Sequence, residues 1–177
     1  HIQHTADVFA QLDWNPHEKF NLIAGLRLDW FSETKLMHLS PKLGLMYKLG
    51  CCSLRGSYAG GFRAPTLKEM YMNFYMGNIF MIYGNPDLRP ESSHNFSLSA
   101  EYMNGRHNLT VTGFYNIVDG RIATAWNQAL GGQVYTNMSR LQVAGVDANA
   151  SGRYPCGISW RLSYAYTYEH IRKGEPM

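Results

Sequence analysis

The sequence predicts an all-β chain, an antiparallel transmembrane β-barrel segment of about eight strands. Three observations lead to this class: apolar and polar residues alternate over long stretches, short and long connections follow one another, and aromatic residues gather near strand ends. Of 177 residues, 14% are aromatic and only 16% are charged, whereas soluble domains carry about 25% charged residues. Aromatic content excludes a disordered chain, and no apolar run approaches the roughly 18 residues of a spanning helix.

Alternation with period two defines each expected strand. Between Phe20 and Trp30 every second residue is apolar, and the same holds between Ile158 and Tyr168. We expect strands at residues 5–14, 20–30, 41–48, 53–60, 95–102, 107–117, 137–153 and 158–169, with 137–153 interrupted near Gly145. Many are longer than the five or six residues typical of soluble sheets.

The connections alternate in length. Short turns are expected at 15–18, 49–52, 104–106 and 154–157, and long connections at 31–40, 61–92, 118–136 and from 171 onward. Outer-membrane barrels have such short periplasmic turns and long external loops. Aromatic residues such as Trp14 and Tyr102 flank the short turns, and others such as Tyr58 and Tyr115 lie toward the other rim, which is typical of interface girdles. The polar face is rich in Ser, Thr, Asn and Gly and suits a wet lumen better than the charged outer face of a β-sandwich.

The order of the connections also bears on domain organisation. Because the first connection is short, the first strand should start outside the cell, and the last strand should finish outside as well. A free-standing barrel normally has both termini in the periplasm, so we expect residues 1–177 to be part of a larger barrel domain.

The net charge of +3 is spread along the chain, which argues against a nucleic-acid partner. Cys51, Cys52 and Cys156 have neither disulfide-framework nor zinc-site spacing and should be free thiols.

Two boxes about twenty residues apart carry the strongest motif signal. They read Phe62-Arg63-Ala64-Pro65 and Asn85-Pro86-Asp87-Leu88, and Ser40–Leu45, Tyr135–Asn137 and Gly145–Asp147 extend the series. This ordered series closely resembles TonB-dependent outer-membrane receptors, from about Val8 to Tyr168. The resemblance implies a barrel of about 22 strands plugged by an N-terminal domain. It also implies an outer-membrane location, lipid around the wall, and contact with the inner-membrane TonB complex through the plug. On this resemblance, we expect the plug and the final strands to lie outside the given sequence.

Physically, the boxes suit the anchoring of a long loop. Pro65, Pro86 and Pro90 cannot donate to a ladder and should end strand pairing. Gly60 and Gly61 would permit a bend at the rim. Arg63 should hold the loop by charge-assisted bonds to Asp87 or Glu91. Both a scaffold role and direct ligand contact remain open for the box residues.

Within this family, the two boxes look most like the haem-uptake branch, in which a loop histidine usually helps to bind iron. Residues 66–84 contain no histidine; they contain four methionines interleaved with aromatic residues. A thioether can ligate haem iron, although methionines also fill a loop's own small core. The candidate ligand contacts are Met76, Tyr75, Met81, Tyr83 and His94. Met76 comes first because it lies mid-loop beside Gly77.

The sequence therefore predicts a receptor for TonB-dependent uptake of a scarce nutrient, with haem or another iron complex first. Alternatives are a cobalamin or siderophore receptor of the same family, a passive porin and an outer-membrane enzyme. No Ser-His-Asp or Cys-His order is tied to a strained turn and no paired carboxylates recur, so we assign no catalytic residue and no catalytic cofactor. Haem would be a transported ligand, and a surface lipoprotein is a further partner that the sequence leaves open.

Overall fold

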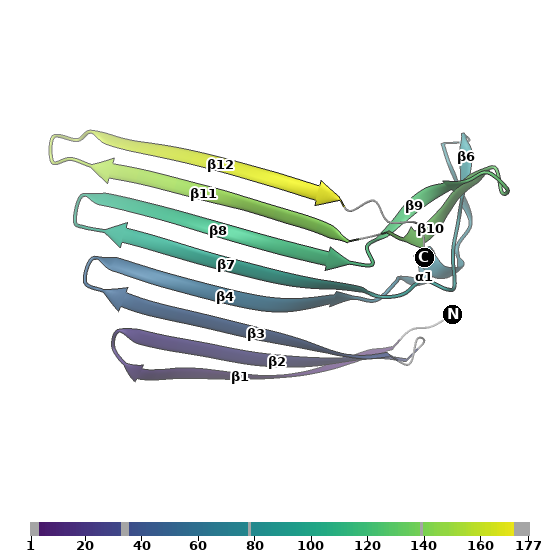
Figure 1. The fold of residues 1–177 in the computed structure, drawn as a ribbon, viewed down its shortest axis with the longest axis horizontal. Coiled ribbons are helices and arrows are strands. Elements are labelled where there is room, and N and C mark those ends of the chain that lie inside the picture. The colour runs from purple at the N-terminus through teal and green to yellow at the C-terminus, as the bar shows by residue number, and fades with distance from the viewer. Residues whose placement is uncertain (1–3, 33–35, 78, 139, 172–177) are drawn as a thin grey trace.

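The wall of the molecule is one antiparallel sheet of eight strands. The computed structural model describes residues 4–32, 36–77, 79–138 and 140–171, so the connection expected after residue 171 lies outside the described residues. The strands lie side by side in the order β1-β2-β3-β4-β7-β8-β11-β12 (Figure 1). Their bounds are β1 Thr5–His17, β2 Phe20–Phe31, β3 Leu36–Leu49, β4 Cys52–Arg63, β7 Glu91–Met103, β8 His107–Asp119, β11 Leu141–Arg153 and β12 Ser159–Ile171. These lengths suffice to cross a bilayer, for which a tilted strand needs about 9–11 residues.

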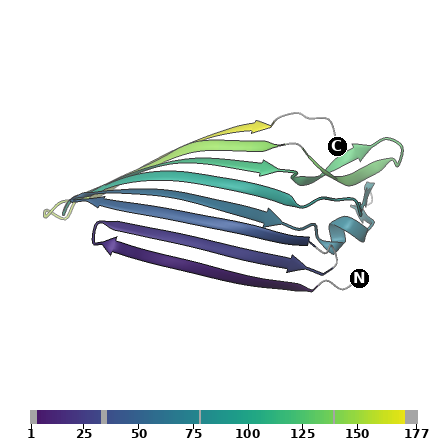
Figure 2. The same cartoon turned by 60° about the horizontal axis from the view of Figure 1, so that its bottom comes forward.

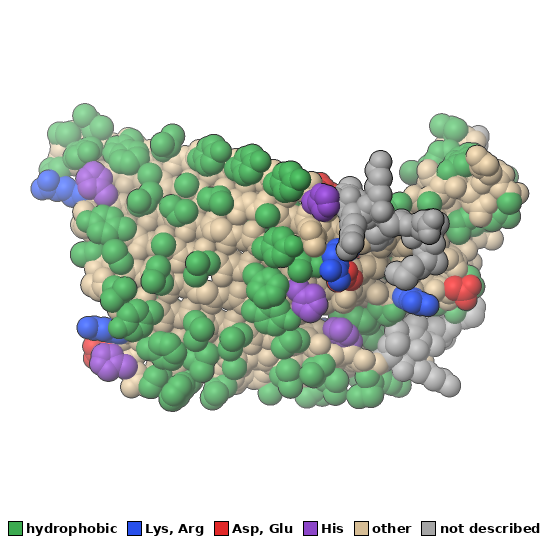
Figure 3. Space-filling model, viewed as in Figure 1, with side chains coloured by type: hydrophobic (Ala, Val, Ile, Leu, Met, Phe, Trp, Pro, Cys, Tyr) green, Lys and Arg blue, Asp and Glu red, His purple; other side chains and the backbone are tan. Residues whose placement is uncertain are grey.

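One face of the wall is apolar from β3 to β12. Cross-strand register aligns Leu43, Tyr58, Phe96, Tyr115, Ala144 and Tyr168 in one row. The next row toward the short turns is Leu45, Gly56, Leu98, Gly113, Val146 and Tyr166. Because side chains alternate along a strand, residues two apart share a face. Figure 3 shows this face covered by hydrophobic side chains, with charged and histidine side chains gathered toward its two ends.

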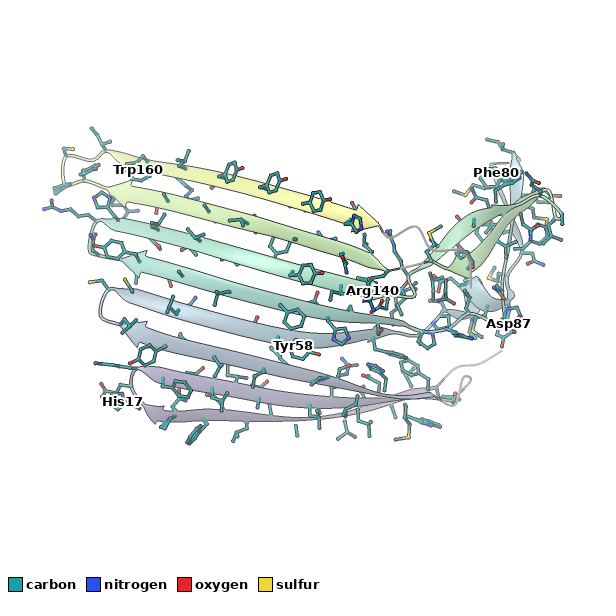
Figure 4. The ribbon with its side chains drawn as sticks, in the orientation of Figure 1. His17, Tyr58, Phe80, Asp87, Arg140 and Trp160 are labelled. Atoms are coloured by element: carbon teal, nitrogen blue, oxygen red, sulfur yellow. The ribbon has the colours of Figure 1, made fainter. Side chains whose placement is uncertain are left out.

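Aromatic residues border this apolar face near the short turns, as the girdle prediction expects. Trp14 and Phe20 meet edge to face, with ring centroids 6.4 Å apart. His107 packs beside Tyr154 and Trp160, at 5.7 and 6.3 Å. Figure 4 places Trp160 and His17 at this end and Tyr58 toward the opposite end.

The opposite face of the wall is polar. The Ser57 and Ser97 hydroxyls lie 2.7 Å apart across β4 and β7. Beside them Arg55 forms an ion pair of 3.2 Å with Glu101. In a closed barrel this face lines the lumen. Figure 2 shows the sheet turned by 60°, with its eight strands still side by side. The predicted fold class, an antiparallel transmembrane barrel segment with an apolar outer and a polar inner face, is confirmed.

Several strand limits differ from the prediction, and so do the roles expected for three glycines. β3 starts at Leu36 and runs through Pro41, which pairs with Leu26 of β2. Ladder pairing between β3 and β4 begins only after this proline, at Lys42 and Ala59, because proline has no N–H to donate. Gly60 and Gly61 are no rim bend, because both lie inside β4 and pair with His94 and Ser93 of β7. A Cβ at Gly60 would lie 2.8 Å from Pro41 Cδ. β11 also passes Gly145 without interruption.

The four predicted short turns all lie at the same end of the wall. Each joins neighbouring strands, as β7 and β8 are joined through Asn104, whose side-chain oxygen accepts from the Arg106 and His107 N–H groups. Cys51 and Cys156 lie in two of these turns and Cys52 begins β4; all three are free and exposed. The long connections extend from the opposite end, and they contain a short helix and four short strands where the sequence predicts loops (Figure 1).

This arrangement predicts which ends of the strands face outward. An epitope inserted at Gly77, in the long 61–92 connection, should be accessible to antibody on intact cells. The same epitope at Gly105, in a short turn, should be reached only after the outer membrane is permeabilised. A Cβ at Gly105 would meet nothing within 4 Å, and one at Gly77 would meet only the tip of Ile79, so both positions offer room. Labelling at Gly105 on intact cells would reverse the orientation.

Candidate functional site

The candidate site is a small folded unit, here called the cap, beyond the outer ends of the wall. It consists of α1 Leu67–Tyr71 and of β5 Phe74–Met76, β6 Phe80–Tyr83, β9 Ile122–Asn127 and β10 Gly132–Asn137. The four strands form a sheet in the order β5-β6-β10-β9 (Figures 1 and 2). The central contact joins the two long connections, because β6 and β10 run parallel, with Gln133 opposite Ile82 and Val134 opposite Tyr83. Among the described residues, no helix has the length and apolar character needed to cross a membrane.

The first box ties the cap to the wall through Arg63. Its Nη1 donates to both carboxylate oxygens of Glu69, at 3.0 and 3.1 Å, and its Nη2 donates to Glu91 at 2.6 Å. The same Glu91 oxygen accepts from the backbone N–H of Ile122 at 2.6 Å. One guanidinium therefore connects the last residue of β4 with α1 and with the first residue of β7. Glu91 extends this connection to the start of β9. We call this group (Arg63, Glu69, Glu91) the arginine clamp; of the two predicted partners of Arg63, it contains Glu91 but not Asp87.

The rest of the first box also serves packing. Phe62 stacks on His38, with ring centroids 4.0 Å apart, and contacts Phe31 at 5.6 Å. Pro65 is fully buried, while Ala64 is partly exposed. Box and helix are thus held against the outer end of the wall.

Thr66 begins α1 with a capping box. Its hydroxyl accepts from the Glu69 N–H, and the Glu69 carboxylate accepts from the Thr66 N–H at 2.8 Å. Burial alone would raise the pKa of Glu69, but the hydrogen bonds from Thr66 and Arg63 outweigh it, so this pKa lies below its ordinary value. Glu69 is therefore ionised at neutral pH, as the clamp requires.

The second box holds the two long connections together. The Asn85 side chain donates to the Tyr135 carbonyl at 3.0 Å, and its backbone N–H donates to the Glu69 carbonyl at 2.9 Å. Leu88 is buried with Met70 and Ile122 in the cap's small core, against which Tyr135 packs. Pro86 and Asp87 are exposed, and Figure 4 shows Asp87 at the base of the cap.

Asn137 supplies a second lock between the same connections. Its amide donates to the carbonyls of Arg89 and Gly120, both at 2.7 Å, and its side-chain oxygen accepts from the Arg89 N–H at 2.8 Å. An asparagine uses both ends of its side chain here, the amide as donor and the carbonyl oxygen as acceptor. The Tyr135–Asn137 segment is therefore part of the scaffold.

The structure separates the five candidate ligand contacts. Met76 is exposed and lies opposite Phe80 on one face of the cap sheet, whereas Tyr75 lies opposite Met81 on the other face. Tyr83 shares that second face, and its hydroxyl donates to the Leu130 carbonyl.

His94 lies apart from these four. It belongs to β7 in the wall, where its Nδ1 is 2.9 Å from the Tyr58 hydroxyl. Register places His94 on the same side of β7 as Phe96 and Leu98, which is the apolar face. His94 therefore lies on the apolar face of the wall, whereas the other four candidate residues lie in the cap.

Sequence reasoning missed Trp126. Its ring meets Phe80 edge to face, with centroids 6.0 Å apart, and 58% of its surface is exposed. The sequence predicts a long connection at 118–136, whereas the structure has β9 at Ile122–Asn127. No group of three or more His, Cys, Asp or Glu side chains within the described ranges could hold a metal ion.

Known proteins similar to this chain agree on its family. An iron-regulated outer membrane virulence protein of Vibrio cholerae is 33% identical over 179 residues, which cover 92% of this chain and 26% of the relative. A vitamin B12 transporter, BtuB, of Photobacterium profundum is 30% identical over 113 residues, covering 60% of this chain and 16% of the relative. The chain thus spans about a quarter of the length of the first of these curated relatives.

Solved structures share the fold. The siderophore receptor PirA of Pseudomonas aeruginosa superposes with a TM-score of 0.83 at 22% identity, covering 96% of this chain and 32% of PirA. The FrpB iron transporter of Neisseria meningitidis gives 0.75 at 18% identity, covering 96% of this chain and 26% of FrpB. Residues 2–176 match the family described as TonB dependent receptor-like, beta-barrel. The chain belongs to the TonB-dependent receptor β-barrel family.

Proposed function

We propose that this chain forms part of the wall and an external cap of a receptor that imports a scarce iron complex with energy from the TonB complex. The barrel lies in the outer membrane, as in its family. The single observation that carries the proposal is the cap: two long external connections are locked into one folded unit that exposes aromatic and methionine side chains. A passive pore has no need for such a structure, whereas a receptor needs a fixed surface that a rare ligand can meet.

Haem is the iron complex that we put first. The cap offers flat aromatic surface for a porphyrin, and Met76 is an exposed thioether beside it. The iron-regulated relative from Vibrio cholerae supports an iron-linked role. A cobalamin is the second candidate, because the vitamin B12 transporter is a relative and a corrin is also a large flat ring. The plug and the TonB contact belong to the same proposal.

The test uses the full-length receptor. It is expressed in cells that lack other iron-complex and cobalamin receptors, and uptake of haemin, cyanocobalamin and labelled ferric siderophores is measured with and without a working TonB complex. We expect concentrative uptake of at least one probe, and its loss without TonB. Uptake that continues unchanged without TonB would indicate a porin and reject the proposal.

A further inference from the structure

A basin at the short-turn end of the wall gathers three arginines. It has a volume of about 700 Å³ and spans the β7–β8 turn and the adjoining ends of β11 and β12. Arg106 belongs to that turn, Arg153 is the last residue of β11, and Arg161 lies near the start of β12. We call this feature the arginine basin (Arg106, Arg153, Arg161). Trp160 borders it, and Figure 4 places Trp160 at the end of the wall opposite the cap.

Register places the arginine basin on the polar face of the wall. Arg153 lies opposite Ser159, and Arg161 lies opposite Ser151. Val146 of β11 belongs to the apolar rows, and side chains alternate along a strand, so Ser151 and Arg153 lie on the other face. In a closed barrel the arginines therefore line the lumen, at the end that we expect to face the periplasm.

The charges of the arginine basin are exposed and uncompensated. Within the described ranges, no ion pair or side-chain hydrogen bond engages any of the three guanidinium groups. The other described residues around the basin include no carboxylate. On β7, the Glu101 carboxylate is bound by Arg55 at 3.2 Å. Asp147 of β11 precedes Ser151 by four residues, which is about 13 Å along a strand.

This arrangement holds three like charges close together. The Arg153 N–H donates to the Arg106 carbonyl at 2.9 Å, so the two backbones are adjacent. Arg153 and Arg161 are diagonal neighbours across β11 and β12, a relation that separates residues by about 7–8 Å. Like charges repel one another at this spacing. An anion with two negatively charged groups relieves the repulsion, and a guanidinium can bind a carboxylate through two parallel N–H groups.

The volume of the arginine basin is that of a small-ligand site. Such sites are concave, with volumes of about 300–1,000 Å³ and a few fixed polar groups. Beside the charges, Asn108, Ser151 and Ser159 place amide and hydroxyl groups around the basin. Its position on the lumen face puts it beside the path of an imported ligand.

We propose that the arginine basin is an exit-side binding site for iron complexes that carry two or more carboxylates. Arg153 and Arg161 bind the carboxylates of a complex that has crossed the barrel, and Arg106 lies beside them at the mouth where the complex is released. Haem, with its two propionates, belongs to this class, whereas an uncharged ligand gains nothing from the three arginines. The inference rests on the proposed uptake function and specifies its ligand class.

The first experiment measures how fast phenylglyoxal modifies individual arginines of the full-length receptor. The receptor is held in lipid nanodiscs, which leave both ends of the barrel open to the reagent, and modified peptides are quantified by mass spectrometry. The probes are haemin and haemin dimethyl ester, which differ only in the two free carboxylates. Arg27 is the control arginine, because it lies on the lumen face of β2 outside the arginine basin and its side chain is 56% exposed.

Without a probe, Arg153 and Arg161 should react faster than Arg63, whose guanidinium is held by two carboxylates. Haemin should slow the modification of Arg153 and Arg161 about fivefold or more, because each bound carboxylate covers a guanidinium. Haemin dimethyl ester, which cannot form these ion pairs, should slow it less than about twofold. Neither probe should change the modification of Arg27.

A double variant tests whether the site serves import. Arg153→Gln together with Arg161→Gln removes two charges from exposed side chains, so the wall should stay folded. Haemin binding to the outside of intact cells should be unchanged, whereas TonB-dependent haemin uptake should slow severalfold. Lys19→Gln is the matched control, because Lys19 is an exposed cation in another short turn, outside the arginine basin. Its uptake should equal that of the unmodified receptor.

Three results would overturn the inference. If Arg153 and Arg161 react no faster than Arg63 without a probe, another part of the receptor already covers the basin. Equal protection by haemin and its dimethyl ester, or protection by neither, would show that the basin does not bind carboxylates of the complex. Unchanged haemin uptake by the double variant would show that it has no part in import. Each of these results with TonB-dependent uptake of an iron complex intact rejects the arginine basin and leaves the proposed function standing, whereas uptake independent of TonB rejects the proposed function itself.

Discussion

Replacing Arg63 with methionine should release the cap while the barrel wall stays folded. The variant removes both ion pairs of the arginine clamp and leaves Glu69 and Glu91 near each other without a cation. A hydrogen bond to a charged group contributes about 1.5–3 kcal/mol, and half-exposed pairs contribute less, so we expect a loss of about 2 kcal/mol in cap stability. Limited proteolysis of intact cells should then cut the 61–92 connection at least about tenfold faster, because 1.4 kcal/mol corresponds to a factor of ten.

Two variants make this prediction specific. Arg63→Lys keeps the charge but cannot reach both carboxylates with a planar fork, so it should recover only part of the protection. Arg140→Met removes an exposed ion pair with a single carboxylate at the same rim, and it should leave the cleavage rate nearly unchanged. Equal cleavage in the Arg63→Met variant and the unmodified receptor would show that the arginine clamp does not hold the cap.

The wall could be predicted from the sequence because the alternation of apolar and polar residues repeats within each strand. An antiparallel strand between lipid and lumen must alternate apolar and polar residues, and the row from Leu43 to Tyr168 follows that rule. Turn residues marked where strands end. Strand limits at the outer rim were less accurate, because there β3 continues through Pro41 with only one partner.

The cap was harder because its contacts join segments far apart in the chain. The sequence indicated Arg63 as an anchor and Glu91 as a partner, since opposite charges flank the two boxes. It did not indicate Glu69, whose position depends on the first turn of α1. Neither did it place Trp126 beside Phe80, because the parallel pairing of β6 and β10 brings together residues about fifty positions apart.

Gly145 shows how a motif residue can be read wrongly from pattern alone. As an isolated glycine in an alternating stretch, it suggested an interruption. In the structure it is buried within a continuous ladder, opposite Phe114 of β8 and Thr167 of β12. The Phe114 ring lies directly over it. The glycine is required for space on the lumen face and not for a bend.

Gly145→Ala should therefore impair folding of the barrel. The new Cβ would clash with the Phe114 ring and lie 2.7 Å from the Tyr166 carbonyl oxygen, which is backbone and cannot rotate away. Overpacking of this kind costs about 1–3 kcal/mol. Gly113→Ala is the matched control, because Gly113 lies on the neighbouring strand opposite Val146 and a Cβ there meets nothing within 4 Å. Measured as the fraction of full-length receptor that resists unfolding in cold detergent, Gly145→Ala should fall well below the unmodified protein and Gly113→Ala should match it. Equal resistance of the two variants would show that the strands around Gly145 can shift enough to accept the added methyl group.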